Sequence, residues 1–304
     1  MSLALHRRAE LSDPQIARLE SGLTDFYTHP PARYYQMADK PPERYNPREQ
    51  PYHCDLLSRV LPGTRVLEVG CGTAHLCPQV EARGGHYTGL DHSAELLADN
   101  RRRFPGATFY SLQTPLAQTF DLVASLYTIE HIADPPAYLE RLWRGCRPGG
   151  LVGIICPEFI ASPGYAPSIF YGRTPRRLSA KLKAGAVADA VAHWLDLKWE
   201  APRWKRQALA AAPGAFWINL KPRIFHEDGY DIDTDAVHLV QLRDLVWFFE
   251  SQGGEILQTS QTMPGVDPGV SRYNCYVLAR KPATATGGEG RPGNPIEPTA
   301  PTHL

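Results

Sequence analysis

Apolar runs and helix-like stretches alternate between about residues 61 and 157. The short runs are rich in Val, Ile and Leu, which is typical of buried strands, and each is followed by a turn or by residues at helical spacing. This repeat predicts a parallel sheet covered on both faces, with right-handed connections. We expect strands at RVLEVG (65–70), HYTGLD (86–91), ATFYSL (107–112), FDLVASLY (120–127) and LVGIIC (151–156), and helices at AHLCPQVEARG (74–84), AELLADNRRR (94–103) and PPAYLERLWRGC (135–146).

The alternation lapses after residue 161 and resumes near residue 235. Val187, Val191, Trp194 and Leu195 recur at helical spacing, which predicts a largely helical insertion. DAVHLVQLRDLVWFFESQGG (235–254) predicts an amphipathic helix beginning near Ala236, and two further strands follow at EILQTSQ (255–261) and NCYVLARK (274–281). The expected fold is therefore α/β: a doubly wound sheet of seven strands with a helical insertion between strand 5 and the following helix.

Five segments follow from this pattern. The prediction places an N-terminal helical cap at 1–60, a ligand-binding core at 61–160, an insertion that forms a lid for an acceptor at 161–222, the remainder of the core at 223–282 and a disordered tail at 283–304. The tail prediction rests on its Gly-, Pro- and Thr-rich composition, which offers little to bury.

Composition narrows the class of protein. The 304 residues carry 32 basic and 32 acidic side chains, so the net charge is zero and neither nucleic acid nor an anionic membrane is favoured as a general partner. No apolar run resembles a signal peptide or is long enough to span a bilayer, which leads us to expect a cytoplasmic protein without a membrane span. The six cysteines form no C-x-x-C pair, so we expect free thiols and no structural metal.

The first strand ends in an unusual way. Gly70 and Gly72 follow it directly, and Glu68 stands inside its apolar run. Glycines after the first strand of a parallel sheet allow a ligand to approach the backbone at the edge where such sheets bind ligands. A dinucleotide site would need a third glycine where His75 stands, and a carboxylate near a pyrophosphate would repel it. Glu68 therefore favours a ligand with a cationic group.

The second strand ends at Asp91, where a carboxylate can accept hydrogen bonds from both hydroxyls of a ribose. Capping of the following helix by the DHS segment is the alternative role of this acid. A nucleoside joined to an ammonium group, without phosphate, describes S-adenosylmethionine.

Three segments carry a resemblance to a known family: VLEVGCGTAHL, GLDHS and FDLVASLYTIEHIADPPAYLERLWRGCRPGGLV. Through them the sequence resembles the class I S-adenosylmethionine-dependent methyltransferases, closely from about Pro62 to Pro157. The resemblance implies a Rossmann-like sheet and a cofactor site. Glu68 would orient the amino end of the cofactor, Asp91 would hold the ribose, and His92 would flank the adenine. The remaining implied cofactor contacts are Gly70, Cys71, Gly72, Ser111, Leu112, Ser125 and Leu126. The family often has an aspartate near the adenine at the third strand's tip, where this chain has Ser111 and Leu112.

Catalysis requires alignment of donor and acceptor and, for a hydroxyl acceptor, a general base. His131, in TIEHIADP, is the nearest candidate base, although the resemblance favours a structural or cofactor-side role for it over catalysis. His226 and His238 are alternatives. The acids Asp231, Asp233 and Asp235 do not match a calcium loop, so helix capping by Thr234 or Asp235 is favoured over a metal site.

Aromatic residues are candidates for the acceptor pocket or for plain packing of the insertion. They are Trp194, Trp199, Trp204, Trp217, Tyr165, Phe170 and Tyr171, and Tyr27, Tyr34 and Tyr35 are candidates for an N-terminal cover. We predict a methyltransferase that acts on a small-molecule or sugar acceptor, at oxygen. A nicotinamide-dependent oxidoreductase and a cofactor-binding protein without catalysis are the competing hypotheses.

Overall fold

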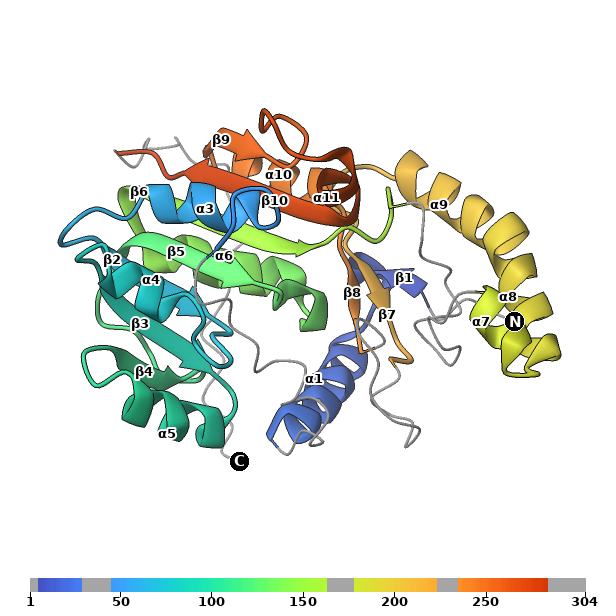
Figure 1. The fold of residues 1–304 in the computed structure, drawn as a ribbon, viewed down its shortest axis with the longest axis horizontal. Coiled ribbons are helices and arrows are strands. Elements are labelled where there is room, and N and C mark those ends of the chain that lie inside the picture. Colours follow the sequence, from blue (N-terminus) through green and yellow to red (C-terminus); the bar gives the residue numbers. More distant parts are fainter. Residues whose placement is uncertain (1–4, 29–44, 163–177, 223–234, 284–304) are drawn as a thin grey trace.

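The computed structural model describes residues 5–28, 45–162, 178–222 and 235–283. Its main sheet has seven strands, and the α/β fold predicted from the sequence is confirmed (Figure 1). In spatial order the strands are β4 (Thr108–Ser111), β3 (His86–Asp91), β2 (Arg65–Val69), β5 (Phe120–Leu126), β6 (Cys146–Pro157), β10 (Asn274–Arg280) and β9 (Glu255–Thr259).

The strand directions explain where a ligand can enter. Strands β2 to β6, the first five strands of the main sheet in chain order, are parallel. Strand β2 pairs with β3 on one side and with β5 on the other. The chain order therefore reverses beside β2, which is the point at which open α/β sheets bind ligands beyond the carboxyl ends of their strands. Strand β10 is antiparallel to both β6 and β9, so the last two strands form the antiparallel edge that their short connection predicts.

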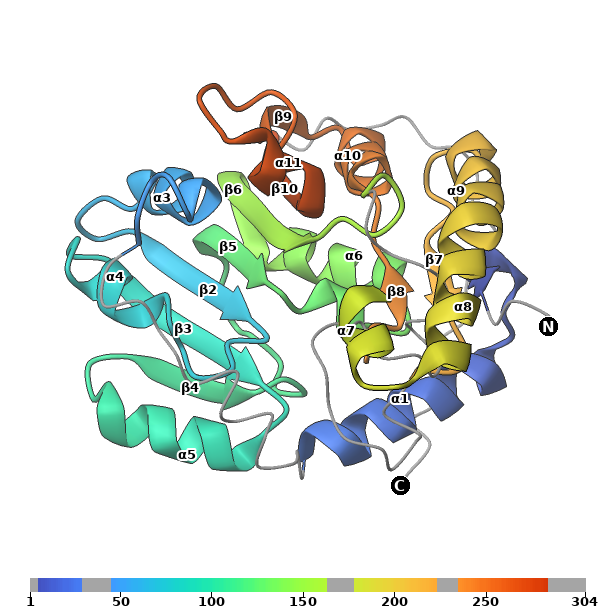
Figure 2. The same ribbon diagram turned by 45° about the vertical axis from the view of Figure 1, so that its right-hand side comes forward.

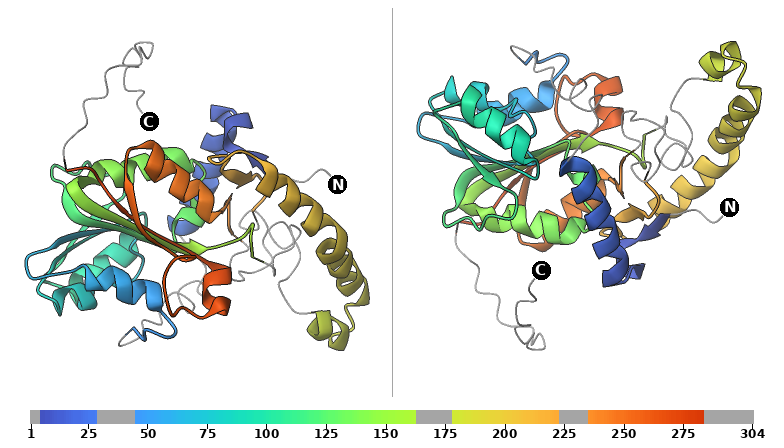
Figure 3. Two further views of the ribbon diagram at one scale, coloured as in Figure 1. Left: turned by 90° about the horizontal axis from the view of Figure 1, so that it is seen from above. Right: turned by 90° about the horizontal axis from the view of Figure 1, so that it is seen from below.

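Helices cover both faces of the sheet (Figure 3). Alternate side chains of each strand point to opposite faces. In β2, Val66 packs into one apolar cluster and Leu67 and Val69 pack into the other. The Val66 face is covered by α3 (Pro51–Ser58), α4 (Cys77–Glu81) and α5 (Ala94–Arg103), and the opposite face by α6 (Pro135–Gly145) and α10 (Leu242–Ser251).

A second, smaller sheet departs from the prediction. Strands β1 (Leu5–Arg7), β7 (Trp217–Asn219) and β8 (His238–Leu239) form it, all antiparallel. The helix expected from Ala236 therefore begins at Leu242 instead. The reason is that residues 236–240 are extended: Ile218 pairs with His238, and the Val237 amide donates to the Glu130 carbonyl at 2.8 Å.

Helix α1 and the insertion lie beyond the carboxyl edge of the main sheet (Figure 2). Helix α1 (Asp13–Thr28) buries Ile16, Leu19 and Leu23 in a third apolar cluster, which also contains Ile218 and Val237 of the small sheet region. The insertion is largely helical where it is described. It contains α7 (Leu178–Lys183), α8 (Val187–Leu195), the π-helical turn η4 (Asp196–Glu200) and α9 (Ala201–Ala210).

Glu158 holds the point at which the insertion leaves and re-enters the core. One carboxylate oxygen accepts from the amides of Ile160 and Ala161, at 3.0 and 2.9 Å. The other accepts from the Leu242 amide at 3.0 Å and from the Cys275 thiol at 3.2 Å. The side chain is buried, so these partners replace water. A single carboxylate thus joins the end of β6, the start of α10 and the start of β10.

We expect Glu158→Gln to lower the free energy of unfolding by about 2 to 4 kcal/mol, because the amide NH₂ group faces buried donors that lose their acceptor. Urea unfolding followed by circular dichroism measures this. Glu140→Gln, which removes an exposed ion pair with Arg144 on α6, is the control and should change stability by less than about 0.5 kcal/mol. Equal effects of the two substitutions would contradict the role assigned to Glu158.

Candidate active site

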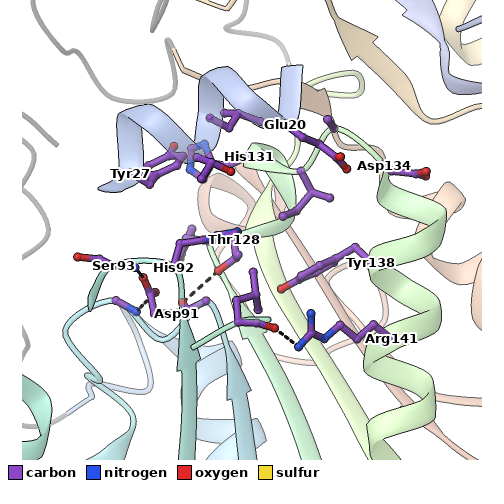
Figure 4. A pocket seen from close by; sticks show the side chains of 18 of the residues that line it. Glu20, Tyr27, Asp91, His92, Ser93, Thr128, His131, Asp134, Tyr138 and Arg141 are labelled. Carbon is purple, nitrogen blue, oxygen red and sulfur yellow. Dashed lines mark hydrogen bonds between the residues drawn. The ribbon is translucent and has the colours of Figure 1, made fainter. Parts of the chain in front are cut away.

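A cavity of about 440 Å³ opens at the carboxyl ends of β2, β3 and β5 (Figure 4). Helix α1 covers it from one side, and α6 forms another wall. Its volume lies in the range of small-molecule sites. The described residues that line it are Glu20, Leu23, Thr24, Tyr27, Gly70, Gly72, Asp91, His92, Ser93, Leu96, Leu112, Tyr127, Thr128, His131, Ile132, Ala133, Asp134, Ala137, Tyr138 and Arg141.

The glycine turn after β2 forms the floor. Gly70 has φ +77°, and a Cβ there would lie 2.3 Å from the Thr128 side chain. The Thr128 hydroxyl also donates a hydrogen bond to the Gly70 carbonyl at 3.2 Å. A side chain at Gly72, with φ +49°, would meet nothing within 4 Å. Gly70 is therefore required by packing, whereas Gly72 leaves the backbone open to a ligand.

Asp91 connects the turn to the end of β3. Its carboxylate accepts from the Gly72 amide at 2.8 Å and from the Ser93 amide at 2.9 Å. The N-cap of α5 is Ser93, whose hydroxyl oxygen accepts from the Leu96 amide. Each carboxylate oxygen can accept a further hydrogen bond, and Asp91 lines the cavity. Its position thus suits a ribose while it also fixes the glycine turn.

Glu68 lies beneath the turn rather than in the cavity wall. The side chain is 3% exposed, and it accepts a hydrogen bond from the Tyr87 hydroxyl. Burial raises the pKa of Glu68 to about 8, although the Tyr87 hydrogen bond acts in the opposite direction. Near neutral pH this carboxyl group is therefore largely protonated, and a cationic group brought close to it would favour the charged form.

The end of β4 meets α6 at one end of the cavity. Leu112 and His92 line this region, whereas Ser111 does not and donates its hydroxyl to Gln113. Gln113 in turn lies 3.0 Å from His92 Nδ1. Arg141 donates to the Leu112 carbonyl and lines the cavity beside it (Figure 4). Nothing in the sequence indicated that Arg141 lines the cavity, apart from its position on the inner face of a helix.

The cavity contacts at the end of β5 lie two residues beyond those expected. Ser125 is fully buried, with its hydroxyl 2.9 Å from that of Tyr138, and neither Ser125 nor Leu126 lines the cavity. Tyr127 and Thr128 line it instead. The Tyr138 hydroxyl donates to the Val69 carbonyl at 3.1 Å. Cys71 is likewise buried and outside the lining.

His131 lies in the cavity wall below α1 and faces an acid from a distant part of the chain. Its Nδ1 is 3.5 Å from Asp235 Oδ2, and that oxygen also accepts from the Tyr27 hydroxyl at 2.7 Å. The rings of Tyr27 and His131 meet edge to face, with centroids 5.5 Å apart. Asp235 is therefore not a helix cap, because α10 begins only at Leu242 and its N-cap residue is Gln241. This grouping joins three segments that no local pattern connects.

Other candidate residues lie elsewhere. His238 is fully buried, where burial lowers the pKa of its imidazole to about 3, and it does not line the cavity. Trp204 is in the core, Trp217 is in the small sheet, and Trp194 and Trp199 are exposed, and none of the four lines this cavity. The remaining candidates are outside the described residues: His226, Asp231, Asp233, Thr234, Tyr34, Tyr35, Tyr165, Phe170 and Tyr171.

The strand order and the ligand cavity define the class as a Rossmann-like α/β protein. Comparison with known proteins narrows it: residues 67–152 match a family described as a methyltransferase domain. The matched segment contains β3, β4, β5 and the glycine turn after β2, so this part of the chain resembles a methyltransferase domain.

Several proteins resemble this chain. A ubiquinone biosynthesis O-methyltransferase of Aeromonas salmonicida is 31% identical over 136 residues, which are 40% of this chain and 56% of that protein. A trans-aconitate 2-methyltransferase of Paracidovorax citrulli is 28% identical over 174 residues, 53% of this chain and 60% of that protein. The chain thus spans a little over half the length of these two curated relatives.

One solved structure shares the fold. It is a 1,6-didemethyltoxoflavin-N1-methyltransferase of Burkholderia thailandensis with bound 1,6-didemethyltoxoflavin and S-adenosylhomocysteine. The TM-score is 0.51 and the identity is 12%, and the match covers 90% of this chain and 91% of that one.

The buried Glu68 carboxyl generates a pH prediction for the ligand-free protein. Burial raises the pKa of Glu68 from its ordinary value of 4.5 to about 8 in the folded state, so the folded state binds the proton more tightly than the unfolded state. This contribution to stability is complete below about pH 4.5 and is lost as the pH rises through about 8. Between these values the free energy of unfolding of the native protein should fall relative to that of Glu68→Gln.

Urea unfolding of both proteins at pH 5, 6, 7 and 8 tests this difference, which has an upper limit of about 1.4 kcal/mol per pH unit. Groups other than Glu68 titrate in both proteins and cancel in the comparison. A difference that is constant across the range would show that Glu68 is not the titrating group.

Proposed function

We propose that this chain is an S-adenosylmethionine-dependent methyltransferase that transfers a methyl group to oxygen of a small-molecule or sugar acceptor. The observation that carries the proposal is the glycine turn at Gly70–Gly72 tied to Asp91, above a buried Glu68, at the reversal point of the sheet. The matched family and the names of the curated relatives support the same reaction class.

The charges around the cavity favour this cofactor over a dinucleotide. Three carboxylates line the cavity, from Glu20, Asp91 and Asp134, and Arg141 is the one Lys or Arg among the described lining residues. A pyrophosphate would meet net repulsion there, whereas a ligand with sulfonium and ammonium groups would be attracted. Glu68 adds an acid close to where the amino end would lie.

The residues present fit the cofactor. The open space at Gly72 would admit the ligand, Asp91 has acceptor capacity for the ribose hydroxyls, and His92 and Leu112, which line the cavity, would flank the adenine. When bound, S-adenosylmethionine supplies an activated methyl group on a good leaving group. The protein then has to align the acceptor, exclude water and remove a proton.

In this proposal His131 removes that proton. Its Nδ1 faces the Asp235 carboxylate, which orients the ring and would stabilise the imidazolium after proton transfer. The ring lies in the cavity wall under Tyr27, so an acceptor hydroxyl bound in this part of the cavity would come within its reach. Asp235 is a positioning residue in this scheme because it acts through His131.

Calorimetric titration tests the cofactor assignment. S-adenosylhomocysteine should bind and NAD should not, and Asp91→Ala should weaken binding by about 1 to 3 kcal/mol through two lost hydrogen bonds. Asp99→Ala, on the same helix-strand unit but paired with Arg102 and Arg103, is the control. Binding of NAD alone would refute the proposal and support the oxidoreductase. Binding of S-adenosylhomocysteine without transfer to a catechol, a tricarboxylate or an amine would support a cofactor-binding protein without catalysis.

We expect His131→Gln to lower kcat for a catechol acceptor by about 10²- to 10⁴-fold, since the hydroxyl loses its general base. Asp235→Asn should lower kcat less and should shift the pH dependence of kcat, because the imidazolium loses its partner. Stopped assays with labelled S-adenosylmethionine over a pH range measure both effects. A His131→Gln enzyme with native kcat and an unchanged pH profile would assign His131 to structure instead.

A further inference from the structure

The insertion contains one long helix with two different apolar faces. Segments α8, η4 and α9 run on without a break from Val187 to Ala210, since the residues at their junctions keep right-handed helical φ and ψ. The inner face is buried and has helical spacing. It consists of Ala190, His193, Ala201, Trp204 and Ala208.

The outer face is apolar as well, although it is exposed. Spaced three and four residues apart, Val187, Val191 and Trp194 share one side of the helix, and Leu195 and Trp199 adjoin them. Their exposed fractions are 56%, 51%, 46%, 42% and 70% in the order Val187, Val191, Trp194, Leu195 and Trp199. The side of a helix that faces water is normally polar, and clustered exposed apolar side chains mark a contact surface.

The position of this helix leaves the outer face accessible. Figure 3 shows α7, α8 and α9 as an arm that stands away from the main sheet. Among the described residues of this arm, Trp204 and Ala208 of α9 are the ones that join the main apolar cluster. We call the side chains Val187, Val191, Trp194, Leu195 and Trp199 the outer stripe.

Charge distinguishes the possible occupants of the outer stripe. Between residues 178 and 210, four exposed cations, Lys183, Lys198, Arg203 and Arg206, outnumber the exposed Glu200 and the half-buried Asp196, and Lys181 is buried. Lys198 follows Trp194 by one turn and so shares the face of the stripe. Asp196 follows Asp189 by seven residues and precedes Glu200 by four, so the three acids share a side of the helix other than that of the outer stripe. Asp189 forms a salt bridge with Lys181 at 2.8 Å.

A second copy of this chain would bring two basic surfaces together, which is unfavourable. An anionic lipid surface complements both features. Tryptophan and leucine side chains lie at the boundary between headgroups and acyl chains, and neighbouring lysines and arginines meet the lipid phosphates. No helix in the described part of the chain has the length and apolar character to cross a bilayer, so contact would be in the plane of the interface.

We propose that the outer stripe and its basic neighbours dock this protein on the surface of an anionic membrane. The inference stands apart from the methyltransferase proposal, because it uses neither the cavity nor the cofactor.

Co-sedimentation of the full chain with vesicles tests the docking. Vesicles of phosphatidylcholine and phosphatidylglycerol in a two-to-one ratio should bind the protein, and vesicles of phosphatidylcholine alone should bind it far less. The double variant Trp194→Ser, Trp199→Ser should bind at least about tenfold more weakly. Lys198→Gln should reduce binding about fivefold, and added salt should reduce it further.

Leu61→Ser is the matched control, because Leu61 is 65% exposed and lies on the core before β2. It should bind vesicles as the native protein does. Circular dichroism checks that the tryptophan variant is folded, and Lys198→Gln provides an independent test if it is not. Native-like vesicle binding by both variants would overturn the proposal. Failure of the native protein to bind anionic vesicles would also overturn it. So would light scattering that shows a dimer of the native protein and a monomer of the tryptophan variant.

Discussion

The Glu158 carboxylate is the interaction on which the arrangement of the whole site depends. A long insertion separates β6 from α10. The sheet can accommodate it only if the two ends of the insertion are held beside each other. Glu158 fixes them by accepting hydrogen bonds from the backbone amides of Ile160 and Ala161, where the chain leaves the sheet, and from that of Leu242, where it returns. Asp235, seven residues before Leu242, is thereby brought to His131.

Burial of this carboxylate has a cost that its partners offset. A carboxyl group removed from water needs hydrogen bonds to replace its hydration, and four donors surround Glu158. Lys205 of α9 is close enough to interact with it electrostatically, although burial lowers the pKa of that amine to about 8. The insertion thus contributes part of the environment of the acid that anchors it.

The main sheet could be predicted from sequence because its signals are local and repeated. Strands β2 to β6 are apolar runs, and helices separate all of them except β4 and β5. The glycines and Asp91 lie at the carboxyl ends of two of these strands, where parallel sheets bind ligands. Strands β7 and β8 contain three and two residues, too few to show an alternation, and so the helix was predicted to begin too early at Ala236. The pairing of His131 with Asp235 and Tyr27 had no sequence signal either, since it joins residues about a hundred positions apart on each side.

Helix α1 is packed differently from the rest of the cavity wall. Its buried side chains belong to a small cluster with Leu11, Ala133, Ile218 and Val237, separate from the two cores that hold the sheet. Proteins open locally in units of lower stability without unfolding globally. The free energy needed to expose the cavity is therefore set by this small cluster and not by the sheet, so the rate at which ligands exchange can change through substitutions in α1 that leave the melting temperature of the core untouched.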